Sequence, residues 1–292
     1  MLHWFVLLFV GVSLLGEDGS LPSFSKDIQK FYESGVEEDR LDKGMGRVEK
    51  VRTETILSRF LPPPPAVILD VGGGMGVYSF PLAKQGYAVY LIDPVAHNID
   101  KAKERGAQLK SAPLQGYIQG DARKLEMPDQ FADVILFFGP LYHLDAQDRN
   151  VALKEAFRVL KPGGVILAVA ISRLAPMVSF FKKGRHEDSD FLETVVQSLH
   201  QGRFQYRGGV FFSHYPRELH DELQTAGFQE IVLRAVEGMG SLLRKQFLND
   251  DYMKDEALRR SLLSLIDQTE QERSILGISS HIMAIGRKAY SE

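Results

Sequence analysis

Four glycines follow an acidic residue within one short stretch of the chain, which contains Asp70, Gly72, Gly73, Gly74 and Gly76. Glycine allows the backbone to approach a ligand closely, and a helix that begins after such a turn offers free N–H groups to a polar or anionic group. The spacing is Gly-x-Gly-x-Gly, whereas the dinucleotide fingerprint requires Gly-x-Gly-x-x-Gly. The stretch also lacks the Gly-Lys-Ser/Thr of a phosphate-binding loop. We therefore expect a ligand-binding loop that belongs to neither of these classes.

Further polar and aromatic residues stand where the next three strands are expected to end. Asp93 ends the second strand, 21 residues after Gly72, and a carboxylate there can accept two hydrogen bonds from a ribose diol. Asp121 and Ala122 follow the third strand, where a carboxylate can accept a hydrogen bond from an adenine amino group. Phe138 ends the fourth strand. Each signal is weak alone, but four successive strand ends with chemically suitable residues form a strong joint signal.

The elements that must position these residues follow from the apolar periodicity. Short β-branched or aliphatic runs alternate with amphipathic stretches, which predicts an α/β fold with a mainly parallel sheet covered by helices on both faces. The strands are expected at 66–71, 88–92, 116–120, 132–138, 165–171, 231–236 and 281–285, and early helices at 77–85, 95–105 and 147–160.

This order of strands, glycine loop and acidic strand ends resembles the class I S-adenosylmethionine-dependent methyltransferases of the small-molecule type. The resemblance covers roughly residues 45–172 well and the last strands more loosely. It implies a doubly wound, seven-stranded sheet in the order 3-2-1-4-5-7-6, with residues 281–285 as the antiparallel seventh strand. It also implies S-adenosylmethionine as the cofactor.

The resemblance further implies a role for each matching residue. Asp70, Gly72, Gly74 and Gly76 would surround the methionine part of the cofactor. The other assignments are Asp93 for the ribose, Asp121 with the Ala122 backbone for the adenine, Phe138 for the floor of the site and Arg52 for the methionine carboxylate.

The residues just after the fourth strand are candidates for the chemistry. The methyl group of a sulfonium is already activated, so alignment with the nucleophile and exclusion of water matter most. Tyr142 and His143 stand where the methyl group is expected to point. We consider His143 as a general base or a substrate hydrogen-bond partner, with local packing of a histidine at a helix start as the alternative. Tyr32 and Tyr206 are expected either to line the substrate cavity or to belong to the core.

Composition narrows the class of site and partner. The 292 residues include no cysteine, which excludes disulfides, thiolate zinc sites, iron–sulfur clusters and a Cys nucleophile. No metal is expected, because no metal-ligand spacing appears among His186, His200, His214 and His220.

The net charge and the loop after the fourth strand indicate the chemical class of the methyl acceptor. The formal net charge is −3, without the basic excess of a general nucleic-acid binder. Residues 138–141 supply no side-chain amide or carboxylate that could polarise an amine of a base. Both features disfavour a nucleic acid and favour a small, partly apolar acceptor.

The chain divides into three predicted parts. Residues 1–22 form an apolar extension, residues 23–61 a helical lead-in that ends before a proline run, and residues 62–292 the cofactor-binding domain. Insertions are expected at about 174–217 and 239–276. The first contains eight aromatic residues, which suits either a lid over the substrate or an extra packing layer.

The apolar run at 4–15 leaves the location open. It is too short to span a bilayer as a helix, which requires about 20 residues, and no Lys or Arg precedes it. It is interpreted either as a weak targeting or anchoring segment or as an unimportant extension. The cytosolic supply of S-adenosylmethionine favours a cytoplasmic protein, with membrane association expected only if this run is an anchor. Nothing in the sequence indicates the oligomeric state.

The leading hypothesis is therefore an S-adenosylmethionine-dependent methyltransferase that acts by direct SN2 transfer to an O, N or C atom of a small molecule. A methyltransferase of protein or RNA is the enzymatic alternative, and it would need a basic docking face. A non-catalytic S-adenosylmethionine-binding protein and a nicotinamide oxidoreductase come from other classes. The glycine spacing disfavours the oxidoreductase.

Overall fold

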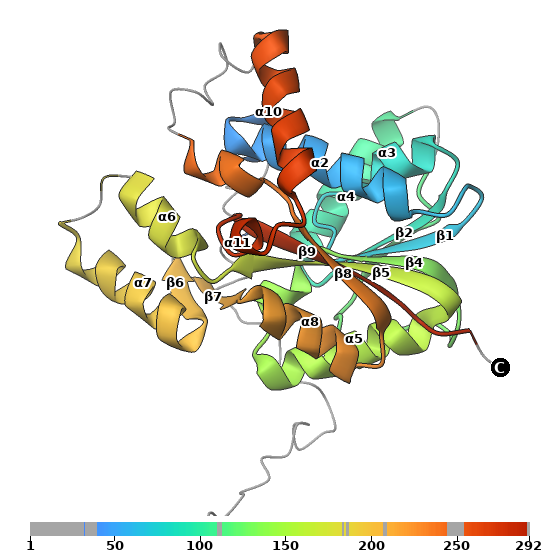
Figure 1. Cartoon of the computed structure of the whole chain (residues 1–292). Coiled ribbons are helices and arrows are strands. Elements are labelled where there is room, and N and C mark those ends of the chain that lie inside the picture. The colour runs from blue at the N-terminus through green and yellow to red at the C-terminus, as the bar shows by residue number, and fades with distance from the viewer. Residues whose placement is uncertain are drawn as a thin grey trace, which may run out of the picture.

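The computed structural model describes residue 32 and residues 40–109, 113–182, 184, 187–206, 209–243 and 254–290. A twisted sheet at its centre carries helices on both faces (Figure 1). The apolar run at 4–15 lies outside the described residues, as do the whole 1–22 extension and most of residues 23–39.

Five parallel strands form the body of the sheet in the order β3-β2-β1-β4-β5. Their nearly continuous apolar sequences suit strands that are buried on both faces. They are β1 (Val67–Val71), β2 (Ala88–Asp93), β3 (Gly116–Gln119), β4 (Ala132–Phe137) and β5 (Leu160–Ser172).

Two further strands complete the predicted sheet. β9 (His281–Arg287) runs antiparallel between β5 and β8 (Gln229–Ala235). The seven predicted strands thus occupy the order 3-2-1-4-5-7-6, and this prediction is confirmed.

The described residues contain two strands more than the seven expected. β6 (Arg203–Tyr206) and β7 (Gly209–His214) form an antiparallel hairpin inside the aromatic insertion. β7 pairs with β5 only at the end of that strand, at 171–172. The hairpin therefore extends the sheet beyond the site edge without changing the order of the core strands.

The helices cover the two faces as the alternation of strands and helices predicts. Ile68 of β1 packs on one face with side chains from α2 (Met45–Phe60), α3 (Ser79–Lys84) and α4 (Ala96–Gln108). The next residue, Leu69, packs on the other face with α5 (Ala146–Val159) and α8 (Pro216–Thr225). Successive side chains of a strand point to opposite faces, so a doubly wound sheet buries both.

The insertions add helices at one end of the sheet. α6 (Ala175–Lys182) and α7 (Ser189–Gln201) share a separate small apolar cluster. α10 (Glu256–Thr269) lies beside α2 (Figure 1), and α11 (Arg273–Leu276) leads into β9. Short 3-10 helices occur at η1 (Arg40–Asp42), η2 (Pro140–Tyr142) and η3 (Gly238–Leu242). None of the helices in the described ranges combines the length and apolarity needed to cross a membrane.

Candidate functional site

The carboxyl ends of the parallel strands meet at one edge of the sheet, and two neighbouring cavities open there. We call them cavity A and cavity B. Both are lined by Tyr32, Gly72 and Gly74, so the glycine loop lies between them. Because β9 runs antiparallel, its first residue, His281, also lies at this edge, opposite Ile171 of β5.

The backbone of the glycine loop explains the Gly-x-Gly-x-Gly spacing. Gly72, Gly74 and Gly76 have φ values of 72°, 57° and 77°, a region that residues with a Cβ rarely adopt. A Cβ on Gly72 would lie 2.8 Å from Cδ of Pro140, which stands just after β4. All three positions therefore favour glycine for their conformation, and Gly72 also for its close approach to the segment after β4.

Asp70 offers an unused acceptor beneath this loop. Its side chain is fully buried and lines cavity B, and its Oδ2 accepts a hydrogen bond from Ser79 Oγ at 2.6 Å. Its Oδ1 has no hydrogen-bond partner among the described residues. Burial raises the pKa of Asp70 to about 6. A ligand that donates a hydrogen bond here would satisfy a costly buried acceptor.

Asp93 ends β2 and lines cavity A, as the sequence predicts. Its Oδ2 accepts from Gly74 N at 2.9 Å, and its Oδ1 accepts from Val95 N and Asn98 Nδ2. Burial raises the pKa of Asp93 above its usual value although these bonds oppose it. The carboxylate is thus fixed in direction and connected to the glycine loop.

Asp121 and Ala122 also line cavity A, across from the glycine loop. Both oxygens of Asp121 accept hydrogen bonds from the side chain of Arg123, at 2.6 Å for the closest pair. Phe138 lies in cavity B, where its ring meets the edge of Tyr78 at 5.4 Å between centroids.

His143 lies in cavity A with Asp93 and Asp121, and Tyr142 lies in cavity B. The Tyr32 hydroxyl is 2.7 Å from Nε2 of His143. Burial lowers the pKa of His143 to about 3, so the ring is neutral near pH 7 and only weakly basic. This environment suits the packing alternative better than a general base.

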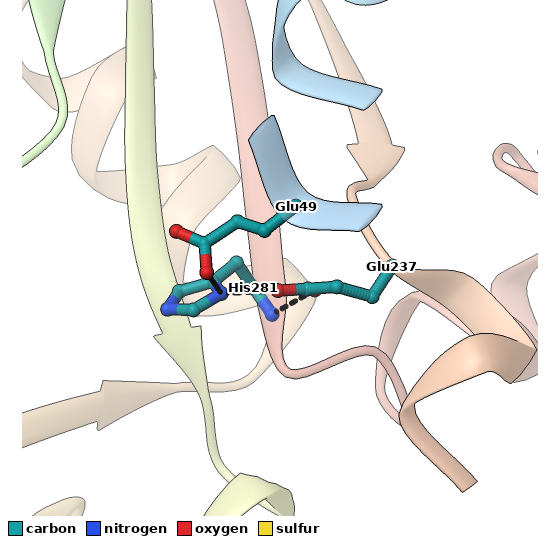
Figure 2. Close-up of side chains that lie close together, drawn as sticks. All are labelled: Glu49, Glu237 and His281. Carbon is teal, nitrogen blue, oxygen red and sulfur yellow. Dashed lines mark hydrogen bonds and ion pairs between the residues drawn. The ribbon is translucent and has the colours of Figure 1, made fainter. Parts of the chain in front are cut away.

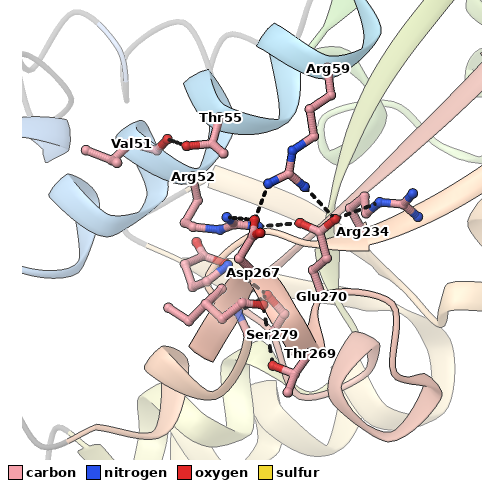
Figure 3. Close-up of polar contacts among 12 residues, drawn as sticks. Val51, Arg52, Thr55, Arg59, Arg234, Asp267, Thr269, Glu270 and Ser279 are labelled. Atoms are coloured by element: carbon pink, nitrogen blue, oxygen red, sulfur yellow. Dashed lines mark hydrogen bonds and ion pairs between the residues drawn. The ribbon is translucent and has the colours of Figure 1, made fainter. Parts of the chain in front are cut away.

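Arg52 is, with Gly76, one of two predicted cofactor residues that, among the described residues, line neither cavity. Its side chain is only 2% exposed and is occupied elsewhere. Its guanidinium instead binds the carboxylates of Asp267, at 2.6 Å, and Glu270 (Figure 3). α10 ends against α2, and the two acids near that end take up the charge of Arg52.

Sequence reasoning missed a group of charged residues on the wall of cavity B. We call Arg40, Glu49, Glu237 and His281 the histidine cluster; Figure 2 shows the last three. Arg40, Glu49 and His281 line cavity B, and the buried Glu237 contacts His281. Nδ1 of His281 lies 2.5 Å from Oε1 of Glu237 and 3.8 Å from Oε2 of Glu49. Burial alone would lower the pKa of His281, but the charges of Glu237 and Glu49 outweigh it and raise the pKa to about 9.

The same three side chains are of types that bind metals. One ligand atom from each of Glu49, Glu237 and His281 lies within 4.8 Å of the others. The histidines considered from the sequence did not include His281. The expected absence of a metal therefore stays a prediction.

The aromatic insertion contributes to the site through its hairpin. Phe204 and Phe211 pack with Tyr32 and Tyr142, and the Phe211 ring lies 5.0 Å from that of His143. α6 and α7 pack mainly against each other. The hairpin thus lies beside residues that line the cavities, whereas α6 and α7 share an apolar cluster of their own, and the lid stays a prediction. The side chain of Tyr206 lies outside the described residues.

The residues of the two cavities fit S-adenosylmethionine chemically. Cavity A presents carboxylates at two strand ends, which suit the hydroxyls and the amino group of adenosine. The glycine loop leads from there to the buried, unsatisfied Oδ1 of Asp70, which can accept from an ammonium group.

Comparisons with known proteins agree with this fit. Residues 69–168 match the family model described as a methyltransferase domain. The ubiquinone/menaquinone biosynthesis C-methyltransferase UbiE of Caulobacter vibrioides is 33% identical over 140 residues, 44% of this chain and 53% of the relative. The malonyl-[acyl-carrier protein] O-methyltransferase of Serratia marcescens is 29% identical over 180 residues, 60% of this chain and 63% of the relative. The chain thus spans little more than half the length of these curated relatives.

Solved structures share the fold. An S-adenosylmethionine-dependent methyltransferase from Methanosarcina mazei superposes with a TM-score of 0.55 at 20% identity, over 81% of this chain and 98% of that one. A phosphoethanolamine N-methyltransferase 2 from Haemonchus contortus, in complex with S-adenosyl-L-methionine, gives 0.55 at 18% identity, over 90% of this chain and 57% of that one. Residues 69–168 of this chain thus match a methyltransferase domain, and the chain shares the fold of these solved methyltransferases.

Proposed function

We propose that the chain is an enzyme that transfers the methyl group of S-adenosylmethionine to an O, N or C atom of a small molecule. The observation that carries this proposal is the pair of cavities joined at the glycine loop. Cavity A has the polar groups that adenosine requires, and cavity B extends from Asp70 to the apolar side chains of Val169 and Val236. The cofactor and an acceptor would therefore meet where Gly72 and Gly74 line both cavities.

The cofactor supplies a methyl group that its sulfonium already activates for in-line attack. The chain has to bind and orient the reactants and exclude water from them. Proximity of the reactants alone can raise the reaction rate by several orders of magnitude. We assign Asp93 to the ribose hydroxyls, Asp121 and the Ala122 backbone to the adenine, and Asp70 with the glycine loop to the methionine part. Arg52 is no longer assigned to the methionine carboxylate, because Asp267 and Glu270 bind its guanidinium.

Aromatic side chains close the acceptor cavity against water. Phe138 and Tyr142 line cavity B, and Phe211 stacks on Tyr142 with 6.5 Å between ring centroids. A partly apolar wall of this kind favours a small acceptor with some apolar surface. The UbiE relative supports this direction, because its name gives a step in ubiquinone/menaquinone biosynthesis. The name of the other relative gives malonyl-[acyl-carrier protein], a small acyl group carried by a protein. A cytoplasmic location is part of this proposal and rests on the supply of the cofactor.

A screen for product formation tests the proposal. Fractions of a metabolite extract are incubated with the chain and S-adenosylmethionine, and S-adenosylhomocysteine is measured by mass spectrometry. We expect at least one low-molecular-mass fraction to yield S-adenosylhomocysteine above the level without extract. Product formation only with protein or RNA fractions would instead support the macromolecular alternative, and none with any fraction would contradict an enzymatic role.

A further inference from the structure

The mechanism proposed so far does not use the histidine cluster, although it lies on the wall of the acceptor cavity. His281 begins β9, and Glu237 lies two residues beyond the end of β8. Both positions are at the carboxyl edge of the sheet, beside the end of β5. The fold therefore places the imidazole of His281 at cavity B, with the buried carboxylate of Glu237 beside it. Along the sheet, this position is far from the carboxylates of cavity A.

Glu237 is held in one orientation. Its side chain is 1% exposed, and its Oε2 accepts from the backbone N of His281 at 2.9 Å and from Ser279 Oγ at 3.1 Å. Ser279 Oγ in turn accepts from the backbone N of Glu237 and of Gly238. The remaining oxygen, Oε1, meets Nδ1 of His281 at 2.5 Å. A carboxylate bound at this many points cannot turn away from the ring.

This contact fixes which nitrogen of His281 is free for chemistry. Nδ1 donates to Glu237, so in the neutral ring Nε2 carries the lone pair; the tautomer is inferred from this hydrogen bond. Figure 2 shows Nε2 on the side of the ring away from Glu237, and the described residues give it no hydrogen-bond partner. His281 lines cavity B. The arrangement is that of a base oriented by a carboxylate, the relation by which many enzymes activate a nucleophile.

We propose that His281 is the catalytic base of the methyl transfer, that Glu237 is its positioning residue, and that the acceptor presents its nucleophilic atom as an O–H or N–H group. This inference rests on the proposed function and specifies its acceptor. It excludes acceptors whose nucleophilic atom carries no proton.

The proposed step balances without a further reactant. A lone pair of the acceptor oxygen or nitrogen forms a bond to the methyl carbon, while the carbon–sulfur bond breaks and its electron pair stays on sulfur. The proton of the acceptor O–H or N–H passes to Nε2 of His281. The carboxylate of Glu237 balances the imidazolium that results, and water then removes the proton.

The charges around His281 predict how the step depends on pH. Glu237 and Glu49 face the ring, Arg40 lies beyond Glu49, and Lys182 of α6 lies near Glu237. Although burial and the charge of Arg40 act in the opposite direction, Glu237 and Glu49 raise the pKa of His281 to about 9. The neutral ring is the reactive form, so the rate should rise with pH and level off above about 9.

His281→Gln tests the base directly, with the extract fraction that supports wild-type turnover as the probe. We expect turnover to fall by at least about 100-fold, the usual scale for a lost general base, while the affinity for S-adenosylhomocysteine changes by less than about threefold. His220→Gln is the matched control, because His220 lies on the surface of α8, outside the lining of either cavity, and pairs with Asp221. It should leave turnover unchanged.

Glu237→Gln tests the positioning role through the pH profile. Without the carboxylate the pKa of His281 falls, so the rise of kcat/KM with pH should move to lower pH. In His281→Gln the rise should vanish. A purely structural role of Glu237 would lower turnover or stability without moving the profile.

The possible failures are distinguishable. Turnover of His281→Gln close to the wild-type value would overturn this inference and leave the proposed function standing. No S-adenosylhomocysteine from any fraction with the wild-type chain would contradict the proposed function, and the inference would fall with it. Turnover that EDTA abolishes and Mg²⁺ or Zn²⁺ restores would also overturn it, because the cluster would then be a metal site.

Discussion

Two clusters of charged side chains connect α2 with the C-terminal part of the chain, and they differ in what surrounds them. In the histidine cluster, Arg40, Glu49 and His281 line cavity B, and Figure 2 shows how Glu49 and Glu237 lie around His281. The other, which we call the ion-pair cluster, lies between α2, β8 and the end of α10 (Figure 3) and consists of Arg52, Arg59, Arg234, Asp267 and Glu270.

In the ion-pair cluster the charges satisfy one another. Glu270 is 3% exposed and pairs with Arg52, Arg59 and Arg234, and none of these residues lines either cavity in the described part of the chain. In the histidine cluster the pairing uses Nδ1 of His281 and leaves Nε2 without a hydrogen-bond partner among the described residues, and His281 lines cavity B. Similar charged residues can therefore either stabilise the packing of helices or take part in catalysis. Access of these residues to a cavity determines which of the two roles they can have.

The largest expected effect is on stability, from breaking the ion-pair cluster. Arg52→Met leaves Glu270 and Asp267 short of a buried partner, and removal of one member of a buried pair costs about 3–5 kcal/mol. Urea unfolding measures this cost. Arg59→Ala is the control, because its side chain is 38% exposed and such pairs contribute about 1 kcal/mol or less.

The same Arg52→Met variant tests the assignment made from sequence. If Arg52 serves only the ion-pair cluster, the folded variant should bind S-adenosylhomocysteine with nearly wild-type affinity. If calorimetry showed that the affinity falls tenfold or more, Arg52 would again be assigned to the methionine carboxylate. The two clusters would then not differ in the way described above.

A medium effect is expected from pH, and only in the histidine cluster. The pKa of His281 is about 9 when folded and near its ordinary 6.5 when unfolded, so between these values the folded state binds more protons. The stabilisation is complete below about pH 6.5 and is lost as pH rises towards 9. From 6.5 to about 8 the free energy of unfolding should fall by about 1 to 2 kcal/mol. In His281→Gln the free energy of unfolding should change less with pH over this interval. The same pH dependence in the variant and the wild type would contradict this explanation.

The smallest effect is expected at the outer rim of cavity B. Arg40 binds Glu49 with both terminal nitrogens, but its side chain is 39% exposed. Arg40→Ala should therefore cost less than about 1 kcal/mol in urea unfolding. A cost as large as that of Arg52→Met would mean that burial does not separate the two clusters.

The fold and the glycine loop could be predicted because their signals are local. Each strand shows its apolar run in a few consecutive residues, and Gly72, Gly74 and Gly76 share one turn whose positive φ values only glycine adopts readily. Asp93 and Asp121 follow their strands directly, so the order of strands was sufficient to place both at cavity A.

The clusters could not be predicted in this way because their members are far apart in the chain. Glu49 and His281 are separated by more than 230 positions and meet only through the packing of α2 against the sheet. A usable signal existed for Glu237 and His281, which flank two predicted strands at the site edge. For Arg52 no local pattern indicated that the carboxylates near the end of α10, and not the methionine carboxylate of the cofactor, would bind its guanidinium.

Burial also changed the expected role of His143. Its position after β4 was correct, but no local pattern indicated that Tyr32 and Phe211 would enclose the ring. Enclosure without a nearby charge lowers the pKa of this histidine, whereas the two glutamates raise that of His281.

The central claim is that this edge of the sheet binds S-adenosylmethionine, and calorimetric titration tests it most directly. S-adenosylmethionine, S-adenosylhomocysteine and NAD are titrated into the wild-type chain and into Asp93→Ala. We predict that the first two ligands bind and NAD does not, and that Asp93→Ala loses at least about tenfold in affinity because a charged hydrogen-bond acceptor is removed. Tight binding of NAD without the other two, or unchanged affinity in Asp93→Ala, would contradict the account.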